Sequence, residues 1–246
     1  MLRFVLNDFV VETESHPGTS ALDYLRNEAK LTGVKHACRE GDCGSCVVLL
    51  GQAEGPFARY QVVTSCLLPM GALAGRHVVT IEGLNQRKPG PIEQAFNDEG
   101  ASQCGFCTPG FVISLTGHLI ETPRWDEDDA IEAIAGNICR CTGYASIRRA
   151  MTTVLDRLSS RVDPSEERVQ ALVRDGFLPD HFLRTGELLS GLDTVAPHPP
   201  PDASRLIIAG GTDLYVQRPD EIPNNDVWVL PIDNQRSIWS KGDGIY

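Results

Sequence analysis

The chain has 246 residues, 41% of them hydrophobic and 22% charged, which is the composition of an ordinary globular protein of one to three domains. Its formal net charge of -11 disfavours nucleic acid as a partner, because phosphate binding needs clustered lysine and arginine. No stretch approaches the roughly 20 apolar residues of a membrane span, and the first residues lack the apolar centre of a signal peptide. We therefore expect a cytoplasmic protein without a membrane partner.

The first part of the chain combines β-prone runs with one helix. The runs span residues 2–6, 9–13, 47–50, 60–67 and 77–81. Asn7-Asp8 lies between the first two runs and predicts a hairpin. Ser20 is placed to cap a helix over residues 21–28. Together these signals predict one helix lying across a small mixed sheet.

Helical periodicity takes over in residues 84–160. Thr108-Pro109 places a cap and a proline at the start of a helix whose apolar residues recur at helical spacing over 111–120. Acidic residues open a second helix over 126–135, and a third spans 145–158. The pattern predicts a compact helical domain.

The composition changes again after this helical region. Residues 161–204 alternate acidic and basic side chains and then reach the proline-rich stretch 196–201, which is typical of a linker. A strand-like run over 205–209 follows and ends in Gly210-Gly211-Thr212-Asp213, and another apolar run spans 227–232.

Eight cysteines are the strongest chemical signal in the sequence. In a reducing compartment they are expected to be metal ligands and not disulfides. Their spacing divides them into two groups of four, Cys38, Cys43, Cys46 and Cys66, and then Cys104, Cys107, Cys139 and Cys141.

The first group has the spacing of a plant-type 2Fe-2S site, in which three cysteines in one loop are joined by a distant fourth. Gly41 and Gly44 can adopt the positive φ angles that aim backbone N–H groups at the sulfurs. The alternative is a zinc site, since Cys43 and Cys46 alone form a common zinc pair, but Cys38 is poorly spaced for zinc. The first group therefore favours iron-sulfur.

The second group places one cysteine pair just before each of two helices. The partial positive charge of a helix N-terminus favours thiolates and a negatively charged cluster. A thioredoxin-like dithiol is the alternative for Cys104 and Cys107, although it expects a βαβ setting. Spacing alone leaves both interpretations open.

Long motifs around these cysteines resemble the xanthine oxidase, or molybdenum hydroxylase, family, and especially the iron-sulfur and FAD subunit of bacterial xanthine dehydrogenase. The motifs are REGDCGSC at 39–46, EGL at 82–84, QCGFCTPG at 103–110 and GNICRCTGY at 136–144.

The resemblance implies an α+β chain with a β-grasp ferredoxin domain, a helical 2Fe-2S domain, a linker and the truncated start of an α+β FAD-binding domain. The corresponding residue ranges are 1–83, 84–160, 161–204 and 205–246. It also implies that Gln103 lies close to the molybdopterin cofactor of a partner subunit. The flavin contacts that it implies are Ile207, Ile208, Ala209, Gly210, Gly211, Thr212, Asp213 and Leu214.

The function implied is that of an electron-transfer subunit with no catalytic residues of its own. Single electrons would pass from the molybdenum cofactor of a large partner subunit through two 2Fe-2S clusters to FAD and on to NAD, within a hetero-oligomer. Hypoxanthine and xanthine are the expected substrates, because the ferredoxin, helical and flavin segments are fused in one chain. About 40 residues after Arg205 are too few to fold alone, so either the chain is truncated or a separate chain completes the FAD domain.

Three alternatives stay open at this point. The chain could be the iron-sulfur subunit of a related hydroxylase that acts on an aldehyde, an N-heterocycle or carbon monoxide. It could be a free-standing ferredoxin-type carrier, or its cysteines could form a zinc scaffold, which would show no visible absorption and no EPR signal.

Overall fold

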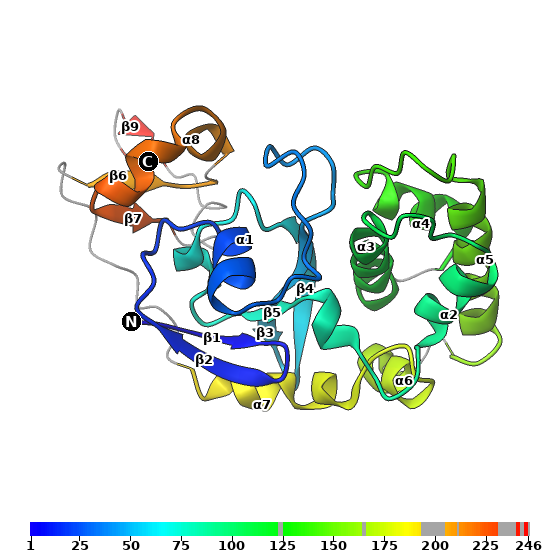
Figure 1. Cartoon of the computed structure of the whole chain (residues 1–246). Coiled ribbons are helices and arrows are strands. Elements are labelled where there is room, and N and C mark those ends of the chain that lie inside the picture. The colour runs from blue at the N-terminus through cyan, green and yellow to red at the C-terminus, as the bar shows by residue number, and fades with distance from the viewer. Residues whose placement is uncertain are drawn as a thin grey trace.

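A five-stranded mixed sheet forms the centre of the computed structural model (Figure 1). Its order is β2-β1-β5-β3-β4, where the strands are β1 (Leu2–Leu6), β2 (Phe9–Thr13), β3 (Val47–Glu54), β4 (Phe57–Thr64) and β5 (His77–Val79). β1 and β5 are parallel, and the other neighbours are antiparallel. Asn7, with a φ of 57°, turns the chain between β1 and β2, so the predicted hairpin is confirmed.

The structure describes residues 1–122, 125–163, 166–192, 205–210, 212–230, 240–241 and 244–245. No helix among them is long and apolar enough to cross a membrane.

Both faces of the central strand β3 are buried, and its successive side chains point to opposite sides of the sheet. Val48 and Leu50 of β3 point to the face covered by α1 (Ala21–Asp23) and the π-helical turn Tyr24–Glu28. Val47 and Leu49 belong to the core on the other face. This double burial explains the uninterrupted apolar run in the sequence. The helical segment is capped as predicted, since Ser20 Oγ accepts a hydrogen bond from Asp23 N at 3.2 Å.

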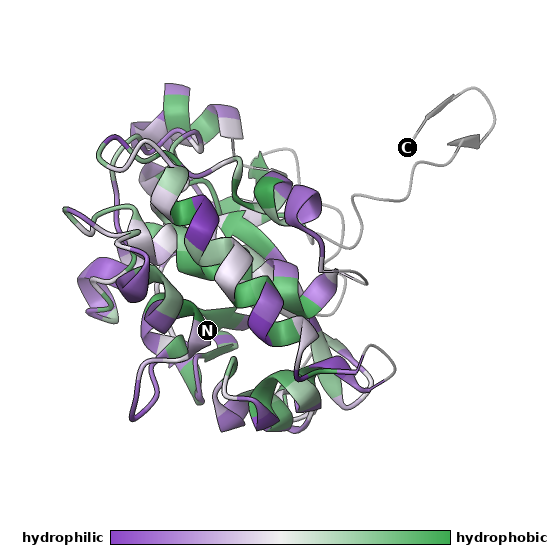
Figure 2. Cartoon of the chain, turned by 90° about the vertical axis from the view of Figure 1, so that its right-hand side faces the viewer, coloured by the Kyte–Doolittle hydropathy of each residue, from purple (hydrophilic) through white to green (hydrophobic). Residues whose placement is uncertain are grey.

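The other face of the sheet packs against a domain of four helices. These are α2 (Pro91–Asp98), α3 (Thr108–Glu121), α4 (Glu127–Ile134) and α5 (Ala145–Ser159), and they confirm the helices predicted in this region. Helix α3 lies between the sheet and the other helices, and its residues from Gly110 to Ile120 are all buried. In Figure 2, which looks onto this domain, hydrophobic and hydrophilic segments alternate along the outer helices, as expected of elements that bury one face.

Residues 168–192, within the range expected as a linker, fold back onto the domains that precede them. They form α6 (Arg168–Arg174), a 3-10 turn (Asp180–Arg184) and α7 (Thr185–Ser190), which lie along the lower edge in Figure 1. Their buried apolar side chains, Val169, Leu172, Phe177, Leu178, Phe182, Leu189 and Leu192, join the core between sheet and helices. The charged residues that suggested a linker lie between these apolar positions. Residues 193–204 lie outside the described residues, and the division into domains stays a prediction.

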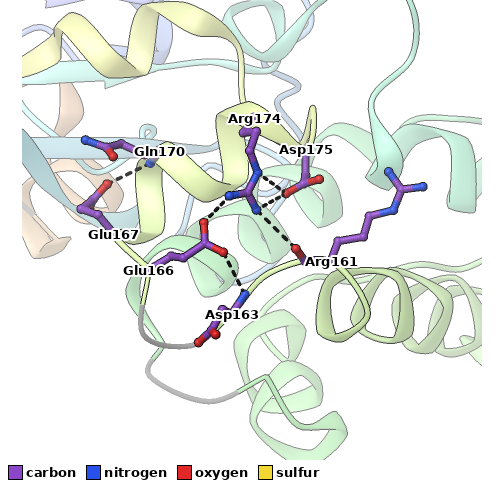
Figure 3. A network of polar contacts seen from close by, with 7 residues as sticks. All are labelled: Arg161, Asp163, Glu166, Glu167, Gln170, Arg174 and Asp175. Carbon is purple, nitrogen blue, oxygen red and sulfur yellow. Dashed lines mark hydrogen bonds and ion pairs between the residues drawn. The ribbon is translucent and has the colours of Figure 1, made fainter.

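A polar network connects the start of this returning segment to the residues that follow α5 (Figure 3). Arg174 pairs with Glu166 and with Asp175, and its Nη2 donates to the Arg161 carbonyl at 3.3 Å. Glu167 caps α6, since its Oε2 accepts from Gln170 N at 2.9 Å. Exposed charge pairs of this kind contribute little to stability, so the network orients the segment and the apolar residues hold it.

A buried polar cluster connects α7 to the sheet. His77 Nε2 lies 2.7 Å from the Asn7 carbonyl oxygen, and His77 Nδ1 lies 2.7 Å from Tyr60 Oη. A carbonyl can only accept, so Nε2 donates and Nδ1 accepts from the tyrosine hydroxyl. Tyr60 Oη also lies 3.5 Å from Thr185 Oγ1 of α7. Burial lowers the pKa of His77 to about 4, so the imidazole is neutral near pH 7 and Nδ1 is the acceptor.

A small C-terminal unit packs against the first domain. β6 (Leu206–Ile208) and β7 (Val227–Val229) pair in parallel, and α8 (Thr212–Gln217) and a 3-10 turn (Pro219–Asn224) connect them. The predicted strand-like run at 205–209 is confirmed as β6, and the apolar run at 227–232 contains β7, with Pro231 and Ile232 outside the described residues. Tyr215 Oη donates to the Gly18 carbonyl at 2.6 Å and anchors the unit. Short strands β8 (Ser240–Lys241) and β9 (Gly244–Ile245) pair with each other.

Truncating Phe182 should loosen the returning segment. Its side chain is 1% exposed, and Phe182→Ala is expected to lower the free energy of unfolding by about 3–5 kcal/mol because it leaves a cavity. Leu183→Ala is the matched control, since Leu183 is 42% exposed and should change stability by less than about 0.5 kcal/mol. Urea denaturation measures both, and equal effects of the two changes would contradict the packing described.

Acid should destabilise the fold through His77. The folded pKa is about 4 and the usual pKa is 6.5, so between these values only the unfolded chain takes up the proton, and stability falls as the pH falls. We expect a loss of roughly 2–3 kcal/mol from about pH 7 to about pH 4.5, beyond the loss in His77→Gln. Urea midpoints at the two pH values measure this difference, and identical pH profiles for the two proteins would refute the assignment.

Candidate metal centres

The first cysteine group gathers at one end of the sheet. Cys46 immediately precedes β3, Cys66 follows β4, and Cys38 and Cys43 lie in the loop before β3. Cys46 and Cys66 are 3% and 4% exposed, and the other two are half-buried. The thiols stand as two pairs, because Cys38 Sγ lies 3.2 Å from Cys43 Sγ, and the Cys46 and Cys66 thiols are close enough to shift each other's pKa. Two adjacent pairs suit a centre with two irons and four thiolates.

The backbone of this loop turns its polar groups toward the sulfurs. Gly41 and Gly44 have φ angles of 83° and 66°, so the expected positive values are confirmed. A Cβ atom on Gly41 would lie 2.7 Å from Leu67 Cδ1, which also requires glycine there. Glu40 N donates to Cys38 Sγ at 3.4 Å, and the Ser45 hydroxyl lies 3.2 Å from Cys43 Sγ. Such contacts stabilise thiolates and raise the reduction potential of a bound cluster.

One thiol of the buried pair is favoured as a thiolate. The hydrogen bond from Cys66 lowers the pKa of Cys46 to about 6, while the same contact raises the pKa of Cys66. Thiolates are the form in which cysteine binds metal.

The second cysteine group lies where α3 and α5 begin. Cys107 is the residue before α3, and Cys139 and Cys141 lie in the loop before α5. Cys104 Sγ lies 3.6 Å from Cys141 Sγ, and the Cys107 and Cys139 thiols are close enough to influence each other's pKa, so this site also consists of two pairs. Burial raises the pKa of Cys107 to about 12. Among the described residues, no three His, Cys, Asp or Glu side chains are gathered around a single-ion position.

The second site is much more open than the first. Cys104 and Cys141 are exposed, as are the apolar side chains of Phe106 and Ile138, at 45% and 53%. Gln103 is exposed beside Cys104.

Two residues that sequence reasoning missed shape the second site. Tyr144 has a φ of 68°, which is unusual for a residue with a side chain, and its Oη accepts from Cys139 N at 2.9 Å. Thr142 Oγ1 donates to Cys139 Sγ at 3.2 Å. Their position directly after the Cys139–Cys141 pair was the available signal, but their roles depend on the path of the chain in space.

The two sites lie next to each other across the domain boundary. Ile138 N donates to the Cys43 carbonyl at 3.0 Å, and Asn137 Nδ2 donates to the Gly44 carbonyl at 2.9 Å. The loop of the first site is therefore hydrogen-bonded to the segment that leads into the second.

The residues expected to contact a flavin lie in the C-terminal unit. Ile207 and Ile208 belong to β6, Ala209 and Gly210 follow it, and Thr212, Asp213 and Leu214 open α8, whereas Gly211 lies outside the described residues. A cavity of about 520 Å³ separates this unit from the first site. Cys38 and Cys66 line it on one side, and Tyr215 and Ile222 line it on the other.

Two protein-family domains match the chain, one for each cysteine group. Residues 4–70 match a "2Fe-2S iron-sulfur cluster binding domain", and residues 80–152 match a "[2Fe-2S] binding domain". The chain therefore contains two 2Fe-2S-binding domains.

Several curated proteins are similar to the chain. A "Probable xanthine dehydrogenase" subunit of Bacillus subtilis is 37% identical over 157 residues, which is 64% of this chain and 86% of the relative. "Nicotine 6-hydroxylase small subunit" of Paenarthrobacter nicotinovorans is 42% identical over 129 residues, 52% of this chain and 73% of the relative. "Aldehyde oxidase 2" of Cavia porcellus is 40% identical over 60% of this chain, and the matched part is only 11% of that much longer protein.

Solved structures are also similar to the chain. Quinoline 2-oxidoreductase from Pseudomonas putida 86 superposes with a TM-score of 0.53 at 34% identity, over 63% of this chain and 93% of that chain. The aldehyde oxidoreductase from Desulfovibrio desulfuricans superposes with a TM-score of 0.59 at 31% identity, over 68% of this chain and 18% of that chain.

The difference in exposure predicts an order of thiol reactivity. In the chain without iron, we expect an alkylating reagent to modify Cys104 first, because it is exposed and a hydrogen bond from the Phe106 backbone lowers its pKa. Cys46 and Cys66 should react last. Mass spectrometry after brief alkylation measures the order, and urea-unfolded chain is the control in which the differences should vanish. Equal labelling of Cys46 and Cys104 in the folded chain would contradict the geometry.

Proposed function

Because the chain belongs to the iron-sulfur subunits of the molybdenum hydroxylase family, we propose that it relays single electrons from a molybdenum-cofactor-binding large subunit to FAD and NAD. The observation that carries this proposal is the placement of two unlike four-cysteine sites in adjacent contact, one open to the surface and one beside a cavity. A 2Fe-2S cluster, when bound, accepts and returns one electron at a time. The chain supplies ligands, spacing and hydrogen bonds, and we assign it no catalytic residue.

We assign the ligands by site. Cys38, Cys43, Cys46 and Cys66 would hold one cluster, and Cys104, Cys107, Cys139 and Cys141 the other. Support comes from the paired thiols of each site, from the positive φ angles in the loops and from the match of each region to a 2Fe-2S-binding domain.

The difference in exposure between the two sites supports a direction for the relay. The second site, with exposed Cys104, Phe106 and Ile138, offers an apolar surface around a metal centre, which suits docking of a protein partner. Gln103 shares this surface and would lie near the molybdopterin of the large subunit. The first site borders the cavity beside α8, so the flavin would occupy that side, with contacts from residues 207–214.

We propose purine oxidation, of hypoxanthine or xanthine, as the reaction of the complete cytoplasmic hetero-oligomer. Support comes from the fused C-terminal unit and from the Bacillus subtilis relative, whose name refers to xanthine dehydrogenase. A related hydroxylase is the second candidate, because the relative named for nicotine hydroxylation is comparably similar at 42% identity. A separate chain could complete the flavin domain.

Purification of the native complex tests the proposal. We expect iron in the chain, a co-purifying large subunit that contains molybdenum, flavin, and two distinct EPR signals after reduction. Cys43→Ser should remove one signal and about half of the iron while leaving the other signal, and Cys107→Ser should do the reverse. Each variant thus serves as the control for the other. The chain without its partner should not oxidise hypoxanthine.

Several results would refute the proposal. Zinc in place of iron would indicate a scaffold, and a chain that purifies alone with iron would indicate a free-standing carrier. Turnover of hypoxanthine by the chain alone would also contradict the role assigned.

A further inference from the structure

Three chain segments meet where the two cysteine sites approach each other. They are the loop of the first site at Cys43-Gly44, the start of α3 at Gly110, and the turn at Gly136-Asn137 that leads to the second site. The segments contact one another through their backbones, because glycine stands at the closest points. A Cβ atom on Gly44 would lie 2.5 Å from the Gly136 carbonyl oxygen, and one on Gly110 would overlap the Gly44 carbonyl oxygen.

Asn137 supplies the side chain that fills this junction. It is 4% exposed, and its Nδ2 donates to the Gly44 carbonyl oxygen at 2.9 Å. That carbonyl faces Gly110, so the buried amide of Asn137 satisfies an acceptor that the close approach shields from water. None of these atoms belongs to a cysteine, so the contact has no part in binding iron directly.

The next residue forms a hydrogen bond between the two sites. Ile138 N donates to the carbonyl of Cys43 at 3.0 Å, and Ile138 is bonded to Cys139. From the Cys43 sulfur to the Cys139 sulfur, the route is covalent except for this one hydrogen bond. The length of this hydrogen bond depends on how firmly the loop of the first site is held against residues 136–138.

We propose that Asn137 is a positioning residue that couples the two cluster sites by holding the Gly44 carbonyl and thereby the Cys43–Ile138 hydrogen bond. The inference rests on the proposed function, in which both sites hold 2Fe-2S clusters. With both clusters bound, one electron would leave the second site, which would be oxidised, and arrive at the first, which would be reduced. No bond forms or breaks and no proton moves. The amide of Asn137 fixes the distance over which this transfer occurs.

The test compares Asn137→Asp with Asn97→Asp in the full chain within its complex, with iron bound. Both changes replace an amide by a carboxylate, but Asn97 is an exposed residue of α2. In the reduced wild-type complex we expect EPR signals from both sites, split by their magnetic interaction. Asn137→Asp should keep both signals at full intensity and change the splitting, because the separation of the two sites changes, whereas Asn97→Asp should leave the splitting as in the wild type.

Hydrogen exchange gives a second readout that does not depend on turnover. In Asn137→Asp, the Ile138 amide should exchange about tenfold faster, because the hydrogen bond that protects it is weakened. Peptides that cover residues 136–140 report this change by mass spectrometry.

The outcomes separate this inference from the proposed function. A wild-type complex without either EPR signal overturns both. Two wild-type signals with unchanged splitting and exchange in Asn137→Asp overturn the role of Asn137 alone. Asn137→Ser is the second variant, and if both variants lose iron, Asn137 serves assembly of a site and the positioning role is wrong.

Discussion

The packing of helix α3 against the sheet is the constraint on which the rest of the structure depends. Gly117 lets the helix approach closely, because a Cβ atom there would lie 2.5 Å from Val62 Cγ2 of β4. The same helix begins directly after Cys107, and β3 begins directly after Cys46. The packing of α3 against the sheet therefore sets the distance between the two cysteine sites, because one site lies at the start of α3 and the other at the start of β3.

Local signals in the sequence predicted much of this architecture. The turn at Asn7, the cap at Ser20 and the positive φ of Gly41 and Gly44 depend on a few neighbouring residues, and each was found as expected. The roles of Asn137 and Tyr144 depend on partner atoms that the folded chain brings close, so no local sequence pattern predicted these roles. The return of residues 168–192 was missed for a related reason, because the surface that buries their apolar side chains is formed by earlier parts of the chain.

The two cysteine sites differ in their surroundings more than in their ligands. In the first site Cys46 and Cys66 are buried. In the second site Cys104 and Cys141 are exposed, in the loops that precede two helices. Solvent exposure and hydrogen bonds to sulfur are the means by which a protein sets the potential of a cluster. One chain thus provides two different environments for two four-cysteine sites.

The doubly buried sheet also has a consequence for biosynthesis. When the first 80 residues have left the ribosome, Val47, Leu49 and Val79 have no covering surface, because α3, α6 and α7 are still to be made. An apolar sheet face left open in this way invites association with other chains. The nascent protein is therefore most vulnerable to aggregation before α3, α6 and α7 have been made, and its first domain is a poor module to excise and express alone.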